Sequence, residues 1–256
     1  MTKKIRLGVQ LFTLRDETKD PDNLRDVFSF VKSTGAETVE LSAMPDVPAK
    51  LIADLTKEMN LSVASTHIPY SRLQKDWDSV VADHLIYKSP TIGIPMPPPE
   101  CFFSLSALLK FTASVNRMQE EAAKAGLYMH YHNHHMEFKK KFGSKRIIDI
   151  MYEEFAPEVT FCLDIFWAKY AKADIEKSID MLGTRLTQIH MKGYQKRLFF
   201  PKMCSPAEGI IDYPKCLFQA EKYGTDAALI EIDTIANPRA AINSGMDFLI
   251  ENYAKK

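Results

Sequence analysis

Short runs of apolar and β-branched residues alternate along this chain with longer amphipathic segments. The runs have the length of buried strands and predict eight of them, at residues 5–12, 37–42, 61–67, 87–95, 127–133, 159–164, 186–190 and 227–231. The segments between them carry apolar residues at helical spacing, which predicts helices at 22–34, 49–59, 105–125, 144–155, 173–182, 213–223 and 238–253. This alternation is typical of βα units around a parallel sheet.

The number of units and the length of the chain point to one barrel. No Gly/Ser linker, charge block or low-complexity stretch divides the 256 residues, so a single domain over residues 1–256 is expected. Eight βα units in one domain predict the α/β fold of a (β/α)8 TIM barrel, whose working face lies at the C-terminal ends of the strands. The fourth predicted strand is interrupted by Pro90 and ends at Pro95, and central strands tolerate proline poorly.

Composition narrows the class of protein. With 46% hydrophobic and 26% charged residues, the chain resembles an ordinary globular protein. Lys plus Arg equals Asp plus Glu at 33 each, so no overall field would recruit nucleic acid or an anionic membrane. The four cysteines lack CxxC spacing and are interpreted as reduced thiols. No run approaches 18 apolar residues and no signal-peptide cleavage site is evident, so a cytoplasmic location is expected.

The densest group of polar side chains is the segment YHNHHMEF at residues 131–138, directly after the fifth predicted strand. It holds three of the seven histidines, an amide and a carboxylate. Further ligand-type side chains end three later apolar runs, at Asp164, His190 and Glu231. Because the ends of parallel strands meet at one mouth of a barrel, this pattern predicts one divalent metal ion. The alternative is a solvated His-rich turn.

Two carboxylates, one histidine and a further donor suit Mn, Co, Mg or Zn, with open positions for substrate oxygens. A metal that binds the hydroxyl and adjacent carbonyl of a sugar acidifies the C–H between them, and two carboxylates can then move the proton. Glu137 and Glu231 are the candidates, each as ligand and as acid/base. Strand alternation places Glu231 and Asp233 on one side, so either could be the ligand.

Other side chains are candidates for contact with the substrate. They are His67, His132, His134, Trp167 and Lys192. By the period of two in a strand, His132 and His134 should point in one direction and Asn133 in the other. Trp167 and Phe12 offer apolar walls to a sugar ring, although aromatic residues more often form core.

Seven segments form an ordered set along nearly the whole chain. They are GVQLFTLRD at 8–16, VEL at 39–41, YHNHHMEF at 131–138, LDIFWA at 163–168, IHMK at 189–192, EGIID at 208–212 and IEID at 230–233. Together they resemble the xylose isomerase-like TIM-barrel superfamily, and within it the sugar phosphate isomerase/epimerase group that includes inosose dehydratases and ketose 3-epimerases. The resemblance implies a Glu, Asp, His, Glu metal site, here Glu137, Asp164, His190 and Glu231, with His132 or His134 as alternatives to Glu137.

Two departures from the family pattern bear on the substrate. Met191–Gly193 reads Met-Lys-Gly where relatives often read Leu-Lys-Asp, so an acidic contact after the seventh strand is missing. The stretch between the third and fourth predicted strands is short, which predicts few substrate-covering residues on that side.

These observations and the resemblance indicate a metal-dependent isomerase or epimerase. The expected substrate is a small sugar, keto-sugar or inositol derivative, from which a proton is abstracted next to a carbonyl. The first alternative is a dehydratase or lyase acting on a keto-sugar or inosose. The second alternative is a non-catalytic sugar-binding barrel. We expect a small sugar or polyol as the partner, no nucleic acid or membrane, and possible homo-oligomers.

Overall fold

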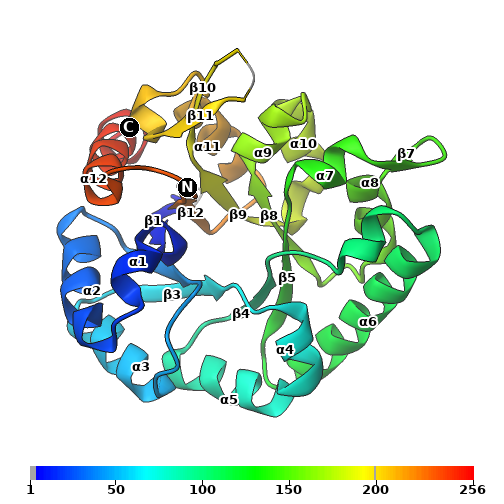
Figure 1. Cartoon of the computed structure of the whole chain (residues 1–256), viewed down its shortest axis with the longest axis horizontal. Helices are drawn as coiled ribbons and strands as arrows, with labels where there is room; N and C mark the ends of the chain where they lie inside the picture. Colours follow the sequence, from blue (N-terminus) through cyan, green and yellow to red (C-terminus); the bar gives the residue numbers. More distant parts are fainter. Residues whose placement is uncertain (1–3, 199) are drawn as a thin grey trace.

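The computed structural model describes residues 4–198 and 200–256. Eight parallel strands form one sheet in the order β3-β2-β1-β12-β9-β8-β5-β4, with helices around it (Figure 1). The strands are β1 (Arg6–Gln10), β2 (Thr38–Leu41), β3 (Ser62–Thr66), β4 (Thr91–Ile94), β5 (Tyr128–His132), β8 (Thr160–Asp164), β9 (Leu186–Met191) and β12 (Ala227–Ile230). Each of the eight predicted strands is present, and the predicted (β/α)8 TIM barrel is confirmed.

The barrel is nearly closed between β3 and β4, the two ends of the strand order. A single parallel bridge joins His67 to Gly93, and the backbone N–H of Ile68 donates to the carbonyl oxygen of Gly93 at 2.8 Å. A Cβ on Gly93 would lie 2.0 Å from the carbonyl oxygen of Thr66. Glycine at this position therefore allows the close backbone approach that closes the barrel.

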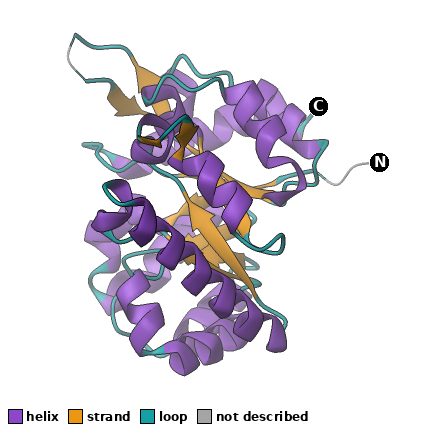
Figure 2. Ribbon diagram, turned by 90° about the vertical axis from the view of Figure 1, so that its right-hand side faces the viewer, coloured by secondary structure: helices purple, strands orange, loops and turns teal. Residues whose placement is uncertain are grey.

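Helices follow most of the strands, as the amphipathic pattern predicted. The corresponding helices are α2 (Leu24–Ser33), α3 (Ala49–Glu58), α6 (Leu105–Lys124), α8 (Ile147–Glu154), α10 (Ile175–Leu182), α11 (Tyr213–Glu221) and α12 (Pro238–Leu249). Short helices α1 (Arg15–Thr18), α7 (His135–Lys139) and α9 (Ile165–Tyr170) lie near the C-terminal ends of β1, β5 and β8. In α2 the buried residues recur at helical spacing, which packs one face against the strands. Figure 2 shows the helices outside the strands in side view.

The stretch between β3 and β4 differs from the prediction. It holds two helices, α4 (Tyr70–Lys75) and α5 (Trp77–Tyr87), so the prediction of few residues on this side was wrong, as was a strand beginning at Tyr87. In α5 the buried side chains are Val80 and His84, whereas Leu85 and Ile86 are about half exposed. The sequence therefore carries no apolar stripe there from which a helix could be predicted.

Two short hairpins lie outside the barrel sheet. β6 (Lys141–Phe142) pairs with β7 (Lys145–Arg146), and β10 (Gly193–Gln195) pairs with β11 (Lys202–Cys204). Both are antiparallel, and neither was predicted from the sequence. Across residues 4–198 and 200–256, the helices are all too short or too polar to cross a membrane.

Candidate metal centre

Four metal-ligand side chains meet at the C-terminal ends of the strands. His132 ends β5, Asp164 ends β8, His190 lies near the end of β9 and Glu231 directly follows β12. One ligand atom from each lies within 4.8 Å of the others, and all four residues are buried. The structure thus brings together three predicted ligands, Asp164, His190 and Glu231. The fourth residue is His132, which the resemblance implied as an alternative to Glu137. We call these four residues the ligand group.

The spacing of the donor atoms fits a divalent ion. His132 Nε2 lies 3.5 Å from Asp164 Oδ2 and 3.9 Å from Glu231 Oε2, and His190 Nδ1 lies 2.9 Å from Glu231 Oε2. Donors bound at about 2.0–2.6 Å to one ion are separated from one another by about 3–4 Å. Within the described residues, His132 Nε2 is buried without a hydrogen-bond partner, as expected of an atom that faces an ion. Two imidazoles and two carboxylates suit Zn, Mn or Co better than Mg, which prefers oxygen.

A lysine ammonium lies against the same carboxylates. Lys192 Nζ is 2.9 Å from Asp164 Oδ2, 2.9 Å from Glu231 Oε2 and 2.7 Å from Asp233 Oδ1. Burial disfavours the charged ammonium, but Asp164, Glu231 and Asp233 raise the pKa of Lys192 well above its ordinary value. Lys192 therefore offsets part of the negative charge of the three carboxylates, and a bound ion would share the oxygens of Asp164 and Glu231 with it.

His190 is held between two carboxylates. Its Nε2 lies 2.6 Å from Glu40 Oε2, and its Nδ1 faces Glu231. Burial disfavours the charged ring, but Cys162, Glu40 and Glu231 raise the pKa of His190 well above its ordinary value. Burial likewise opposes the charge of Glu40, yet His67 and His190 hold its pKa below the ordinary range. A carboxylate on one ring nitrogen orients the other toward a metal, so Glu40 positions Nδ1 of His190.

Gln10, at the end of β1, links His67 to the ligand group. Gln10 Nε2 donates to Glu231 Oε1 at 2.8 Å and lies 3.3 Å from His67 Nδ1. Since an amide nitrogen is a donor, Nδ1 of His67 accepts and Nε2 carries the proton, facing Glu40 Oε1 at 3.6 Å. Burial lowers the pKa of His67 to about 4, which leaves the ring neutral at pH 7. Glu40, His67 and His190 also have metal-ligand spacing, but this group shares His190 with the first.

The HNH segment is arranged as the period of two predicted. His132 and His134 both line the main cavity, with ring centroids 4.7 Å apart. Asn133 turns the other way, and its Oδ1 accepts a hydrogen bond from the backbone N–H of Asp164 at 3.0 Å. Burial lowers the pKa of His134 to about 3, so this ring is also neutral at pH 7. His135 is half-buried and begins α7.

The structure places Glu137 outside the group of four residues. Its Oε1 accepts from the Tyr131 hydroxyl at 2.6 Å, and its Oε2 accepts from the backbone N–H of His134 at 3.0 Å. The second contact caps α7, because Glu137 occupies the third position of that helix. Both carboxylate oxygens are thus committed within this segment, and His132, the alternative first ligand, joins the metal group in place of Glu137.

Trp167 and Lys192, two predicted substrate contacts, are not among the residues that line the cavity. Asp164 Oδ1 accepts from the backbone N–H of Trp167 at 2.9 Å and so caps α9. The Trp167 ring contacts the His134 ring, with centroids 5.8 Å apart. Trp167 therefore packs against the His134 ring, and Lys192 against the carboxylates.

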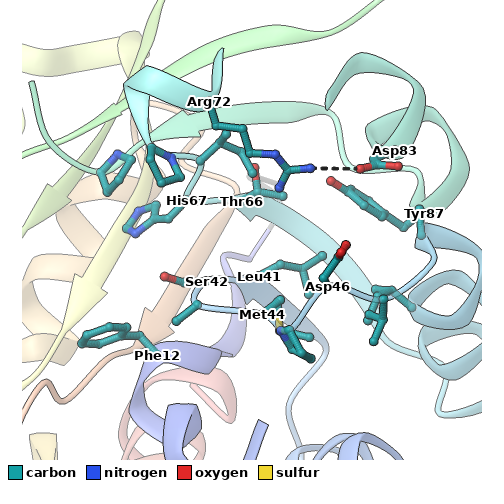
Figure 3. A pocket seen from close by; sticks show the side chains of 18 of the residues that line it. Phe12, Leu41, Ser42, Met44, Asp46, Thr66, His67, Arg72, Asp83 and Tyr87 are labelled. Atoms are coloured by element: carbon teal, nitrogen blue, oxygen red, sulfur yellow. Dashed lines mark ion pairs between the residues drawn. The ribbon is translucent and has the colours of Figure 1, made fainter. Parts of the chain in front are cut away.

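A cavity of about 1420 Å³ opens from the ligand group. Phe12, His67, His132, His134 and Glu231 line its inner part, so His67 and both predicted HNH histidines face it. From there it extends between residues 41–49 and helices α4 and α5. In Figure 3, Phe12 and His67 lie on one side of this space and Asp83 and Tyr87 on the other. Such a site can bind a polyhydroxylated molecule next to a metal ion.

Sequence reasoning did not identify Gln10 and Glu40 as site residues. Glu40 lies in β2, all four residues of which are buried. A carboxylate inside a wholly buried strand is costly without partners, and this was the available signal. The sequence could not name those partners, because His67 and His190 come from other strands.

No family model matches the sequence, and no curated protein matches it. Solved structures do. One is a sugar phosphate isomerase/epimerase from Parabacteroides distasonis ATCC 8503, with a TM-score of 0.77 at 18% identity over 97% of this chain and 94% of that chain. An L-ribulose 3-epimerase matches with a TM-score of 0.76 at 14% identity over 98% and 95%. A probable 3-DHS dehydratase from Bacillus anthracis matches with a TM-score of 0.76 at 14% identity over 96% and 98%. The resemblance predicted from the sequence is confirmed, and at these identities what the matches show is the fold.

Proposed function

We propose that this protein is a metal-dependent isomerase or epimerase that moves a proton next to the carbonyl of a small sugar, keto-sugar or inositol derivative. The observation that carries the proposal is the buried group His132, Asp164, His190 and Glu231 at the mouth of the barrel, of which His132 and Glu231 line a cavity. The similar folds of a sugar phosphate isomerase/epimerase and an L-ribulose 3-epimerase support a carbohydrate as substrate. Mn, Co or Zn suits the donor set best.

A bound divalent ion supplies the polarisation that acidifies a C–H next to a carbonyl. Glu231 is the proton acceptor of the proposal. Although burial raises its pKa, Lys192, His190 and His132 lower it well below the ordinary value, so Glu231 stays ionised. His67 and His134 are neutral and face the cavity, where they can hydrogen bond to substrate oxygens.

A dehydratase or lyase is the second candidate, favoured by the position of Glu137. With Glu137 capping α7, the metal group of the described chain contains one glutamate, and the two-glutamate shuttle loses its second member. Elimination of water needs only one base for the C–H, which Glu231 can provide, because its protonated form can return the same proton to the departing hydroxyl. The similarity in fold to a probable 3-DHS dehydratase supports this alternative.

The test is solvent exchange. The protein with Mn²⁺ is incubated with a panel of ketoses and inososes in D₂O, and the sugars are followed by NMR and mass spectrometry. An isomerase or epimerase introduces deuterium next to the carbonyl without loss of water, whereas a lyase gives a product lighter by one water. Glu231→Gln keeps the size of the side chain but removes the base, and it should abolish exchange. Sugars that bind without any exchange would identify a sugar-binding barrel and overturn the enzyme proposal.

A further inference from the structure

The outer part of the main cavity has no role in the function proposed above. It lies beyond the ligand group, between residues 41–49 on one wall and helices α4 and α5 on the other, as Figure 3 shows. We define this region as the outer chamber. Leu41, Met44, Asp46, Arg72 and Tyr87 are among the side chains that line it.

The cavity is large for one sugar ring. Its volume is about 1420 Å³. Pockets for drug-sized ligands span about 300–1,000 Å³, and a monosaccharide is smaller than most such ligands. A ring whose carbonyl lies at His132 and Glu231 would leave the outer chamber to water. The volume therefore points to a substrate that extends beyond the first ring.

The charges of the outer chamber argue against a phosphate group in that place. Among the described residues that line it, the side chains charged at pH 7 are three carboxylates, Asp46, Asp76 and Asp83, and one guanidinium, Arg72. The guanidinium is already paired, since Arg72 Nη2 lies 3.5 Å from Asp83 Oδ2. A phosphate monoester carries about −1.5 to −2 charges at pH 7 and would be repelled by the unpaired carboxylates. The start of α3 at Ala49 also lies on this wall and favours an anion, but only as a partial charge.

The surface of the outer chamber suits a neutral sugar ring instead. Leu41, Met44 and Ile52 provide apolar surface from the β2–α3 side, on which the C–H face of a ring can pack. Ser79 and Asp83 of α5, with Asp76 just before that helix, provide hydrogen-bonding groups for ring hydroxyls from the opposite side. Apolar walls with a few polar groups are the usual composition of a small-molecule site.

We propose that the substrate is a neutral two-ring carbohydrate, a ketose or keto-sugar in glycosidic linkage, rather than a sugar phosphate. The carbonyl-bearing ring lies at the ligand group and the second ring occupies the outer chamber. This inference rests on the proposed function for the identity of the first ring.

Three ketoses that differ at one position test the inference. Fructose has a free 6-hydroxyl, fructose 6-phosphate carries a phosphate there, and isomaltulose carries a glucose ring there. Their dissociation constants are measured by calorimetry with the Mn²⁺-supplemented protein. Isomaltulose should bind at least tenfold more tightly than fructose, and fructose 6-phosphate should bind more weakly than isomaltulose. The proposal is overturned if fructose 6-phosphate binds more tightly than isomaltulose. It is also overturned if isomaltulose binds no more tightly than fructose, or if neither of these two sugars binds detectably.

Two tryptophan variants test whether the second ring binds in the outer chamber. Ser79→Trp places an indole on the α5 wall, whereas Ser71→Trp places the same group on α4 at an exposed residue that does not line the cavity. Ser79→Trp should reduce the isomaltulose to fructose affinity ratio at least tenfold, and Ser71→Trp should leave it unchanged. If the ratio of isomaltulose affinity to fructose affinity is the same in the two variants, the second ring does not bind in the outer chamber and the proposal is overturned. Deuterium uptake is recorded on the same sugars. Its absence with the affinity order intact overturns the proposed function alone.

Discussion

Removal of the Lys192 ammonium should strongly destabilise the metal-free protein. In Lys192→Met the apolar stem remains, but Asp164, Glu231 and Asp233 lose a partner that lies 2.7–2.9 Å from each. The Lys192 side chain is 1% exposed, so water cannot replace the ammonium without opening the site. Removing one partner of a buried ion pair costs about 3–5 kcal/mol, because an uncompensated charge stays behind.

The free energy of unfolding is measured by urea denaturation at pH 7 in EDTA, with comparison of the m-values. Lys50→Met is the matched control, since Lys50 pairs with Asp54 at 3.0 Å while 77% of its side chain is exposed. We expect a loss of about 3–5 kcal/mol in Lys192→Met and a minor change in the control. Saturating Mn²⁺ should then stabilise Lys192→Met more than the unmodified protein, because a cation returns to the carboxylates. A loss below about 1 kcal/mol, or equal stabilisation by Mn²⁺, would refute the charge balance described here.

Three further predictions concern single histidines and glutamates. Burial lowers the pKa of His84 to about 4, below about 6.5 in the unfolded chain. Between these pH values the unfolded chain binds more protons than the folded protein, so acidification from pH 6.5 to 4 should lower the free energy of unfolding by about 3 kcal/mol through this residue. In His84→Gln, urea denaturation should show a smaller decrease over the same pH range. Deuterium exchange should vanish in Glu231→Gln yet persist in Glu137→Gln, which instead lowers the melting temperature; exchange lost in both would restore Glu137 to the mechanism. Calorimetry should show weaker Mn²⁺ binding in His132→Ala than in His135→Ala, and equal affinities would exclude His132 as a ligand.

Most of the barrel was predictable because each strand forms a short buried run between amphipathic segments. The failure came at α4 and α5, where the buried face of α5 includes His84 and the apolar Leu85 and Ile86 are exposed. His84 is satisfied there by Thr66 Oγ1 at 2.8 Å and by the carbonyl oxygen of Val80 at 2.6 Å. Such a polar contact with a distant strand overrides local pattern, and the chain alone does not reveal it.

The candidate site was predictable where a side chain of a ligand type lies at the end of a strand. Asp164, His190 and Glu231 occupy that position, and the barrel brings them together. Glu137 follows its strand by several residues. Its carboxylate accepts a hydrogen bond from the backbone N–H of His134 and so caps α7, instead of pointing toward the ligand group. Glu40 lies within β2, so its role depended on which side chains the other strands of the barrel turn toward it.

The position of a bound Mn²⁺ ion in a crystal tests the central claim most directly. Anomalous diffraction from crystals soaked in Mn²⁺ locates the ion without reference to activity. We expect one site per chain, with the ion about 2.0–2.6 Å from ligand atoms of His132, Asp164, His190 and Glu231. An ion bound by Glu137, or no anomalous peak at these four residues under saturating Mn²⁺, would contradict the account.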